Sequence, residues 1–199
     1  SLDNGVVLSG DFIKIDGRRG VVGGDRSQLD ADNVCLVSEQ GSARLGRETI
    51  VNVETLNIQA AQGVAIGEDS TVDVGDALAL LSTGQAKASS TVIEKGAVVS
   101  AGSMRLEAPQ RAELGADLIL TVTNELSLIS TGTTSGSSAG IRSGTQLRAT
   151  DITISAQRSA RIGEKASVSA SQQLHIEAGQ CDISRSATIT AGSRSGNCQ

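Results

Sequence analysis

The sequence is nearly free of aromatic residues: it contains no Trp, no Tyr and one Phe, and it has a single Pro. Aromatic side chains bury about 150–250 Å² each and usually anchor a globular core. This core must therefore consist of aliphatic residues and alanine. No apolar run reaches the length of about 18 residues that a membrane-spanning helix needs, so we expect no membrane insertion. The net charge of −5 argues against a basic protein that binds nucleic acid.

Signals for targeting and for common ligands are also missing. No basic segment followed by an apolar stretch opens the chain, and Ser1 is followed directly by patterned sequence. We therefore expect the chain to be part of a longer protein. It has no Gly-Lys-Ser/Thr phosphate loop and no paired histidines. We expect no cofactor and no metal site.

What the sequence does contain is a repeat of about 22 residues, clearest in 64–82 and 160–178. Each copy has a first segment (small-x-aliphatic-Gly), a middle segment (aliphatic-x-small or aliphatic) and a last segment (Leu-x-Ile-x-Ala). The last segment keeps its phase over eight copies, at Ile15, Leu36, Ile58, Leu80, Leu106, Leu128, Ile154 and Ile176. Such persistence of phase predicts a repeat protein.

The other segments supply further columns of like residues. The first segments give Val22, Leu45, Ile66, Val92, Leu114, Ile141, Ile162 and Ile183. The middle segments give Val7, Leu29, Val51, Val72, Val98, Leu120, Leu147, Val168 and Ile189. Two columns hold mainly small residues, one at Ser38, Ala60, Ser82, Ala108, Ser130, Ala156 and Ala178 and one at Ala43, Val64, Ser90, Ala112, Ala139 and Ala160.

Within each segment apolar and polar residues alternate, which indicates strands. Identical short strands one repeat apart favour parallel pairing between stacked coils, about 4.8 Å apart. The sequence thus predicts an all-β fold, a single parallel β-helix over 1–199 with about eight coils, three short strands per coil and a length of roughly 35–40 Å. Large aromatics would overpack so narrow a coil. The glycines after the first aliphatic, Gly46, Gly67, Gly115 and Gly163, are expected to supply a turn conformation that side chains disfavour.

The Ile-Gly and Leu-x-Ile-x-Ala phrases resemble, over nearly the whole chain, bacterial right-handed β-helix repeats of filamentous-haemagglutinin and autotransporter-passenger adhesins. The resemblance implies a right-handed coil and a structural or adhesive segment at the cell surface or outside the cell, with the periplasm as an alternative. It also implies a partner such as a host or neighbouring-cell surface protein or glycan. Such passengers tend to be poor in cysteine, whereas this chain has three.

Two of the cysteines fall in a C-terminal closing coil, 181–199. Cys181 stands one coil after Ala160, and Cys198 stands 22 residues after Ile176, so both are expected to point inward. A disulfide there would close the open end of the helix, add about 3 kcal/mol of stability and indicate an oxidising compartment. Two inert buried thiols are the alternative.

Cys35 lies between two inward residues and therefore points outward, in a column with Lys14 and Asn57. We expect an unpaired surface thiol, with an intermolecular bridge or a bond to a segment outside this chain as alternatives. The single histidine, His175, is outward too and is expected to be a solvated surface residue.

Two repeats carry insertions, 83–91 and 131–140, which both follow Ser-Thr-Gly at the same corner. Because their roots are two coils apart, we expect the loops side by side, roughly 10 Å between roots. Insertions on one side of a solenoid often bind partners. The candidate binding residues are Thr83, Gly84, Lys87, Thr131, Gly132, Thr133 and Thr134, and passive surface loops are the alternative.

An enzyme that acts on polysaccharides is the main alternative function. Asp30 and Asp73 share an outward column, separated by Asn52 and hence about 9–10 Å apart, which is wide for a retaining carboxylate pair. No aromatic platform would stack sugar rings. We therefore expect no catalytic residues and favour a structural or adhesive role. A self-assembling, bactofilin-like scaffold whose coils stack end to end is the third possibility.

Overall fold

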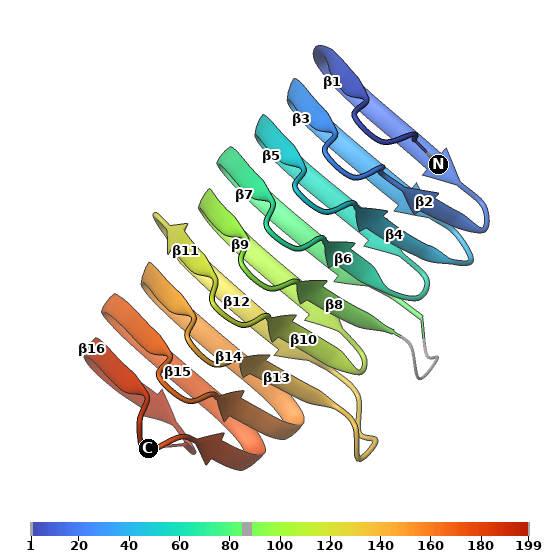
Figure 1. Ribbon diagram of the computed structural model, residues 1–199. Coiled ribbons are helices and arrows are strands. Elements are labelled where there is room, and N and C mark those ends of the chain that lie inside the picture. Colours follow the sequence, from blue (N-terminus) through green and yellow to red (C-terminus); the bar gives the residue numbers. More distant parts are fainter. Residues whose placement is uncertain (1, 85–88, 199) are drawn as a thin grey trace.

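The computed structural model describes residues 2–84 and 89–198, and this part forms a 16-stranded sheet without a helix (Figure 1). All strand pairs are parallel, and the chain winds in stacked coils of about 22 residues for about 8 turns, as predicted. The strands are β1 (Val7–Gly17), β2 (Gly20–Val22), β3 (Gln28–Ser38), β4 (Ser42–Leu45), β5 (Ile50–Ala60), β6 (Val64–Ile66), β7 (Thr71–Ser82), β8 (Ser90–Ile93), β9 (Val98–Ala108), β10 (Arg111–Leu114), β11 (Ile119–Val122), β12 (Glu125–Ser130), β13 (Ser138–Ile141), β14 (Gln146–Ile162), β15 (Ser167–Ile183) and β16 (Thr188–Gly196).

Each coil has three sides, which we call the first-segment, middle-segment and last-segment faces after the parts of the repeat that form them. The prediction of three separate strands per coil needs correction, because middle and last segments usually join into one strand. In β5 the ladder to β7 continues through the corner, with only a register shift between Val53 and Thr55. β14 and β15 run on into the first segment as well, whereas the earlier first segments are short separate strands (Figure 1).

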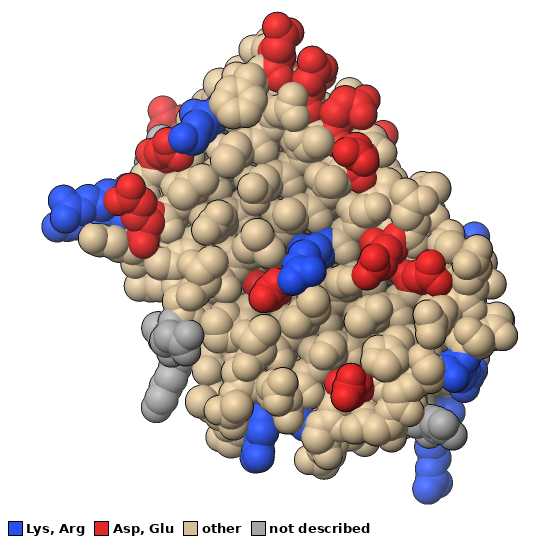
Figure 2. Space-filling view, turned by 180° about the vertical axis from the view of Figure 1, so that it is seen from behind, with Lys and Arg blue, Asp and Glu red and all other residues tan. Residues whose placement is uncertain are grey.

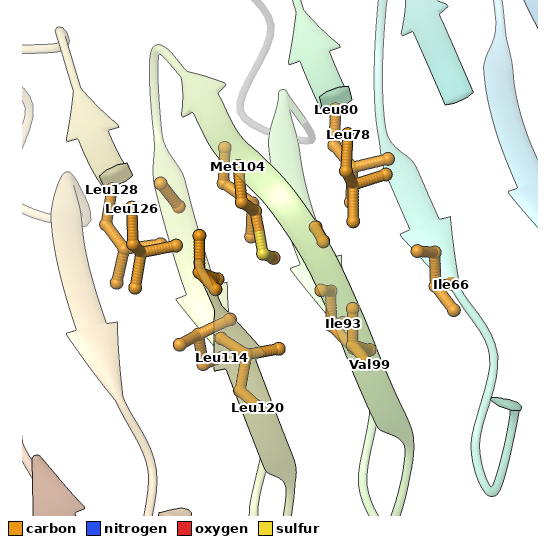
Figure 3. Packing of buried hydrophobic residues seen from close by; sticks show 14 of the residues in the cluster. Ile66, Leu78, Leu80, Ile93, Val99, Met104, Leu114, Leu120, Leu126 and Leu128 are labelled. Carbon is orange, nitrogen blue, oxygen red and sulfur yellow. The ribbon is translucent and has the colours of Figure 1, made fainter. Parts of the chain in front are cut away.

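The core is a set of aliphatic ladders inside the coil, and the predicted last-segment columns are confirmed. Leu36 pairs with Ile58 and Ile58 with Leu80, and all three are at most 1% exposed. Figure 3 shows side chains from successive coils, such as Leu78, Met104 and Leu126, lying in the same interior. Stacking like on like fills this narrow interior without aromatic side chains.

Several predicted positions in the other two columns are wrong by one residue. Val98 is 44% exposed, whereas Val99 is 1% exposed and pairs with Val72. In the same way the inward residue is Leu8 and not Val7, Ile93 and not Val92, and Thr91 and not Ser90. Val22 is outward as well, and its inward neighbour Val21 pairs with Ala43 of the small-residue column. At each of these places two neighbouring residues suit the interior. A shift of one residue exchanges them because side chains alternate between the faces of a strand.

The turn between the first and middle segments fixes this register. Each of these turns except the last, 184–187, contains a residue in the left-handed conformation, three residues before the first inward residue of the middle segment. The residues with positive φ in these turns are Gly5, Arg26, Glu48, Asp69, Gly96, Asp117, Gly144 and Lys165. Most are not glycine, so the fold imposes this conformation against the ordinary preference of the side chain.

The predicted turn glycines serve another purpose, and the expectation about their conformation is wrong. Gly46, Gly67, Gly115 and Gly163 are not among the residues with positive φ. A Cβ at Gly67 would lie 2.3 Å from the carbonyl oxygen of Gly46, one coil earlier. Glycine is needed there because the backbones of adjacent turns approach too closely for any side chain.

The two ends of the solenoid differ from its interior. At the N-terminal end, Val7 and Phe12 of β1 are more than 60% exposed, and Ile13 and Ile15 only partly cover the core. At the other end Ile189 also packs against the core while partly exposed. No helix in the part of the chain that the structure describes is long and apolar enough to cross a membrane.

Candidate binding groove beside the second insertion

The second insertion is a seven-residue loop, shorter than predicted. β12 ends at Ser130 and β13 begins at Ser138, so residues 131–137 form the loop and Ser138–Gly140 belong to the sheet. Likewise β8 begins at Ser90, which limits the first insertion to 83–89. Of the candidate binding residues, Lys87 lies outside the described residues.

Hydrogen bonds hold the 131–137 loop against the preceding coil. The Thr134 hydroxyl donates to Oε1 of Gln110 at 2.9 Å, and the Ser130 hydroxyl donates to the Gln110 carbonyl oxygen at the same distance. The Ser137 amide donates to the carbonyl oxygen of Thr134 at 3.0 Å, which closes a tight turn within the loop. Gly132 lies directly on the preceding coil, since a Cβ there would meet the Pro109 carbonyl oxygen. The loop therefore has a definite position next to the sheet.

The remaining candidate loop residues lie at the roots of the insertions. Amides of Thr83 and Thr131 donate to carbonyl oxygens of the preceding coil, at 2.9 and 3.1 Å, and Thr133 is exposed. Gly84 is packed against the Ala61 carbonyl oxygen. Leu81 of β7 and Ile129 of β12 pair with Glu107 of β9 from opposite sides, so the ends of β7 and β12 lie two coils apart at the same corner. The insertions therefore leave the same corner two coils apart, as predicted.

A groove of about 610 Å³ runs across the first-segment face beside the 131–137 loop. Its floor is Gly140, which stands in an outward column between Glu113 and Arg161. Because the neighbouring coils carry long side chains in this column, the missing side chain at Gly140 leaves a hollow. Ser135 and Gly136 of the loop form one wall of the groove.

The charged groups around this groove are of both signs. Arg142 donates a hydrogen bond to Glu113, whose carboxylate raises the pKa of Arg142 above its ordinary value. Arg161 lies 4.0 Å from Asp182, where both side chains are well exposed. Arg111 has no ion-pair partner among the residues that the structure describes. Guanidinium groups bind carboxylates and hydroxyls through several donors at once, so the groove suits a polar ligand of extended shape.

The acidic residues considered for catalysis lie on another face. Asp30, Asn52 and Asp73 share one outward column, in the predicted order, and line a shallow hollow together with Asp32 and Glu54. The Ser100 hydroxyl donates to Asp73 at 2.5 Å. Within residues 2–84 and 89–198, no group of three His, Cys, Asp or Glu side chains is arranged to hold a metal ion.

The cysteines follow the predicted pairing, with one difference in position. Cys181 and Cys198 are joined in a disulfide with their Cα atoms 5.8 Å apart, which supports the closing of the last coil. Cys181 pairs with Ala160 in the sheet, but it is exposed. Ile176 pairs with Gly196 and not with Cys198, because the last coil is shorter than 22 residues. The predicted inward positions are therefore correct for Cys198 alone.

Cys35 and His175 lie on the last-segment face, both half-buried. Cys35 is a free thiol and pairs in register with Lys14 and Asn57. His175 shares a hydrogen bond of 2.9 Å between its Nδ1 and the Ser195 hydroxyl, and its Nε2 is 3.5 Å from Glu177. With a hydrogen bond at Nδ1 and a carboxylate near Nε2, the imidazole is more constrained than the predicted solvated surface residue.

Sequence reasoning did not find the groove, because Arg111, Glu113, Arg142 and Arg161 belong to no motif. The only sequence signal is Gly140, a glycine in an outward strand position where the adjacent repeats have long side chains. Comparisons with protein-family models, with curated proteins and with solved structures found no match to this chain. The parallel β-solenoid is therefore the class of fold that the structure itself establishes.

Proposed function

We propose that this chain is a rigid, non-enzymatic scaffold of a secreted or cell-surface protein, which holds an adhesive groove at one corner. The observation that carries this proposal is the groove on Gly140, placed beside an ordered loop on a continuous stack of coils. The uninterrupted aliphatic core makes the stack stiff, since each coil is hydrogen-bonded to both neighbours. The disulfide at the C-terminal coil supports an oxidising compartment.

The partner would be a glycan or a surface protein with exposed hydroxyls and carboxylates. The mixed charges of the groove, with Arg111 and Arg161 as donors and Glu113 and Asp182 as acceptors, suit such groups. The resemblance of the repeat phrases to adhesin β-helices points to the same class of partner. Binding would be interfacial, without turnover.

The test fills the groove without disturbing the fold. A Cβ at Gly140 would lie 3.4 Å from its nearest neighbour, the carbonyl oxygen of Arg161, so a side chain there is tolerated by the backbone. Gly140→Gln should abolish binding to a glycan array and to intact cells. Ala65→Gln, in the same outward column three coils earlier, is the matched control and should bind like the wild type.

Equal binding by the Gly140→Gln variant and the wild type, or no binding by either, would refute the adhesive groove. The same preparations should be incubated with acidic and neutral polysaccharides. New reducing or unsaturated ends would instead favour the enzyme alternative, with Asp30 and Asp73 as the carboxylates to substitute next.

A further inference from the structure

The last-segment face is broad, flat and poor in net charge. Figure 2 looks at the molecule from behind and shows a wide surface of uncharged side chains, with a few small charged groups on it and a row of acidic side chains along its upper edge. On this face two outward columns run along the whole solenoid. We call them the inner column, which contains Lys14, Cys35 and Asn57, and the outer column, two residues later on each strand, which contains Asp16, Val37 and Gln59.

The charges of these two columns follow one rule. Where a coil carries ionisable residues in these columns, the basic residue stands in the inner column and the carboxylate in the outer column. The pairs are Lys14 with Asp16 at 3.0 Å, Arg105 with Glu107 at 2.5 Å and His175 with Glu177 at 3.5 Å. The polarity is thus the same at both ends and in the middle of the face.

The uncharged coils follow a second rule, which concerns size. In four of the five uncharged coils the inner column has the smaller side chain and the outer column the larger one, as in Ala79 and Leu81 or Ser127 and Ile129. Thr153 and Ser155 reverse this order. Leu81 and Ile129 are outward and only half-buried. A ridge of larger side chains therefore runs beside a furrow of smaller ones.

We infer that this face binds a second copy of the chain, related by a two-fold axis that runs along the solenoid between the two columns. This rotation places the inner column of one copy opposite the outer column of the other, coil by coil. Each Arg105 then faces Glu107 of the second copy, and the Lys14 and His175 pairs match in the same way. Leu81 faces Ala79 of the second copy, so ridge fits furrow.

The area is sufficient for a stable dimer. Eight coils about 4.8 Å apart, each with about six residues of last segment, present about 750 Å² per copy, or about 1,500 Å² in total. This is the size of a standard specific interface. A two-fold axis parallel to the strands, through the coil of Arg105, would instead place Arg105 opposite Arg105, which electrostatic repulsion disfavours. The inference does not depend on the adhesive groove, which lies on the first-segment face.

Charge variants test the interface. Sedimentation equilibrium of the 199-residue chain should show a dimer with a Kd of about 10 µM or tighter. Arg105→Glu should weaken it at least tenfold, because four carboxylates would then meet at the centre. The exchange R105E/E107R should restore the dimer, since the exchanged pair is again complementary to itself. Arg148→Glu, an exposed change on the middle-segment face, is the matched control and should leave the Kd unchanged.

The decisive measurement mixes the wild type with R105E/E107R. Opposite the wild type, the exchanged pair places carboxylate against carboxylate and guanidinium against guanidinium. Mixed dimers, counted by native mass spectrometry with one partner isotope-labelled, should therefore be at least tenfold rarer than either homodimer. A monomeric wild type at about 300 µM, an Arg105→Glu variant that dimerises normally, or freely formed mixed dimers would each overturn the inference.

Discussion

The turn glycines offer the sharpest test of how the coils are held together. A Cβ at Gly67 would lie 2.3 Å from the Gly46 carbonyl oxygen, 2.5 Å from its carbon and 2.8 Å from the Arg47 nitrogen. All three atoms belong to backbone, so no side-chain rotation relieves the contact. In Gly67→Ala the two turns must separate, which also weakens the hydrogen bond from the Gly67 amide to the Leu45 carbonyl oxygen, 3.1 Å long.

The expected loss of stability follows from these two effects. Overpacking of a well-packed site costs about 1–3 kcal/mol, and a weakened backbone hydrogen bond adds about 1 kcal/mol. Gly67→Ala should therefore lower the free energy of unfolding by about 2–4 kcal/mol. In urea, monitored by far-ultraviolet circular dichroism, this corresponds to a midpoint lower by about 1–2 M for a slope of about 2 kcal/mol per M.

Two matched variants make the result specific. Asp69→Gly lies two residues further along the same turn. It releases the left-handed strain at Asp69, which stabilises the fold, and it adds conformational freedom to the unfolded chain, which destabilises it. The free energy of unfolding should therefore change by less than about 0.5 kcal/mol. Gly136→Ala places a Cβ 3.5 Å from its nearest neighbour and should change stability by less than about 1 kcal/mol. If Gly67→Ala is as stable as Gly136→Ala, the close approach of the turns does not require glycine and the reasoning fails.

Three further predictions concern other parts of the solenoid. Replacing Cys181 and Cys198 by Ser should lower the free energy of unfolding by about 3 kcal/mol for a loop with sequence separation 17, and should speed amide exchange in β16. The backbone amide and guanidinium of Arg47 lower the pKa of Asp25 below its ordinary value of 3.8, so this carboxylate stabilises the fold above that pH and the effect is lost as the pH falls through the folded pKa. Asp25→Asn should therefore be less stable than the wild type at about pH 6, and the difference should shrink as the pH falls below 3.8, as measured by urea unfolding over a series of pH values. Thr145→Val should cost about 1–2 kcal/mol in urea unfolding, because the buried Thr145 hydroxyl donates at 2.7 Å to a turn carbonyl of the preceding coil.

The repeat allowed the fold to be predicted because its period appears in every coil. The last-segment columns were found correctly, since residues such as Leu56 and Ile58 are flanked by polar residues. The predicted register was wrong by one residue where two adjacent residues both suit the interior, as at Val98 and Val99. Alternation alone cannot choose between such neighbours. Counting three residues from the left-handed turn residue, here Gly96, would have given Val99.

The left-handed residue itself was hard to recognise, because its identity changes from turn to turn. Glycine is expected at a left-handed position, yet Glu48, Asp69 and Lys165 occupy it here. The glycines that recur most clearly in the sequence, such as Gly67, are instead required by the close approach of the backbones of adjacent coils. That requirement comes from the distance between two backbones far apart in sequence, so no local pattern reveals it.

The candidate groove and the self-complementary face differ in how far a sequence can predict them. The groove depends on one missing side chain, at Gly140, and on the way the 131–137 loop is bonded to Gln110. Both features depend on the tertiary structure and cannot be predicted from a local sequence pattern. The face, by contrast, depends only on which residues share a column, as Arg105 and Ser127 do, and the pairing register gives these columns directly.

The close turn contacts and the flat face are connected through the pitch of the solenoid. If a side chain at Gly67 forced two turns apart, the strands of those coils would no longer be evenly spaced, and columns such as the one through Ala79 and Arg105 would bend. Two such faces can match coil by coil only while the spacing of about 4.8 Å is kept along their whole length. Gly67→Ala should therefore weaken the proposed dimer as well as the fold, even though Gly67 lies in a turn away from that face. A Gly67→Ala variant that remains folded in dilute buffer and dimerises with the wild-type Kd would show that the face does not depend on a uniform pitch.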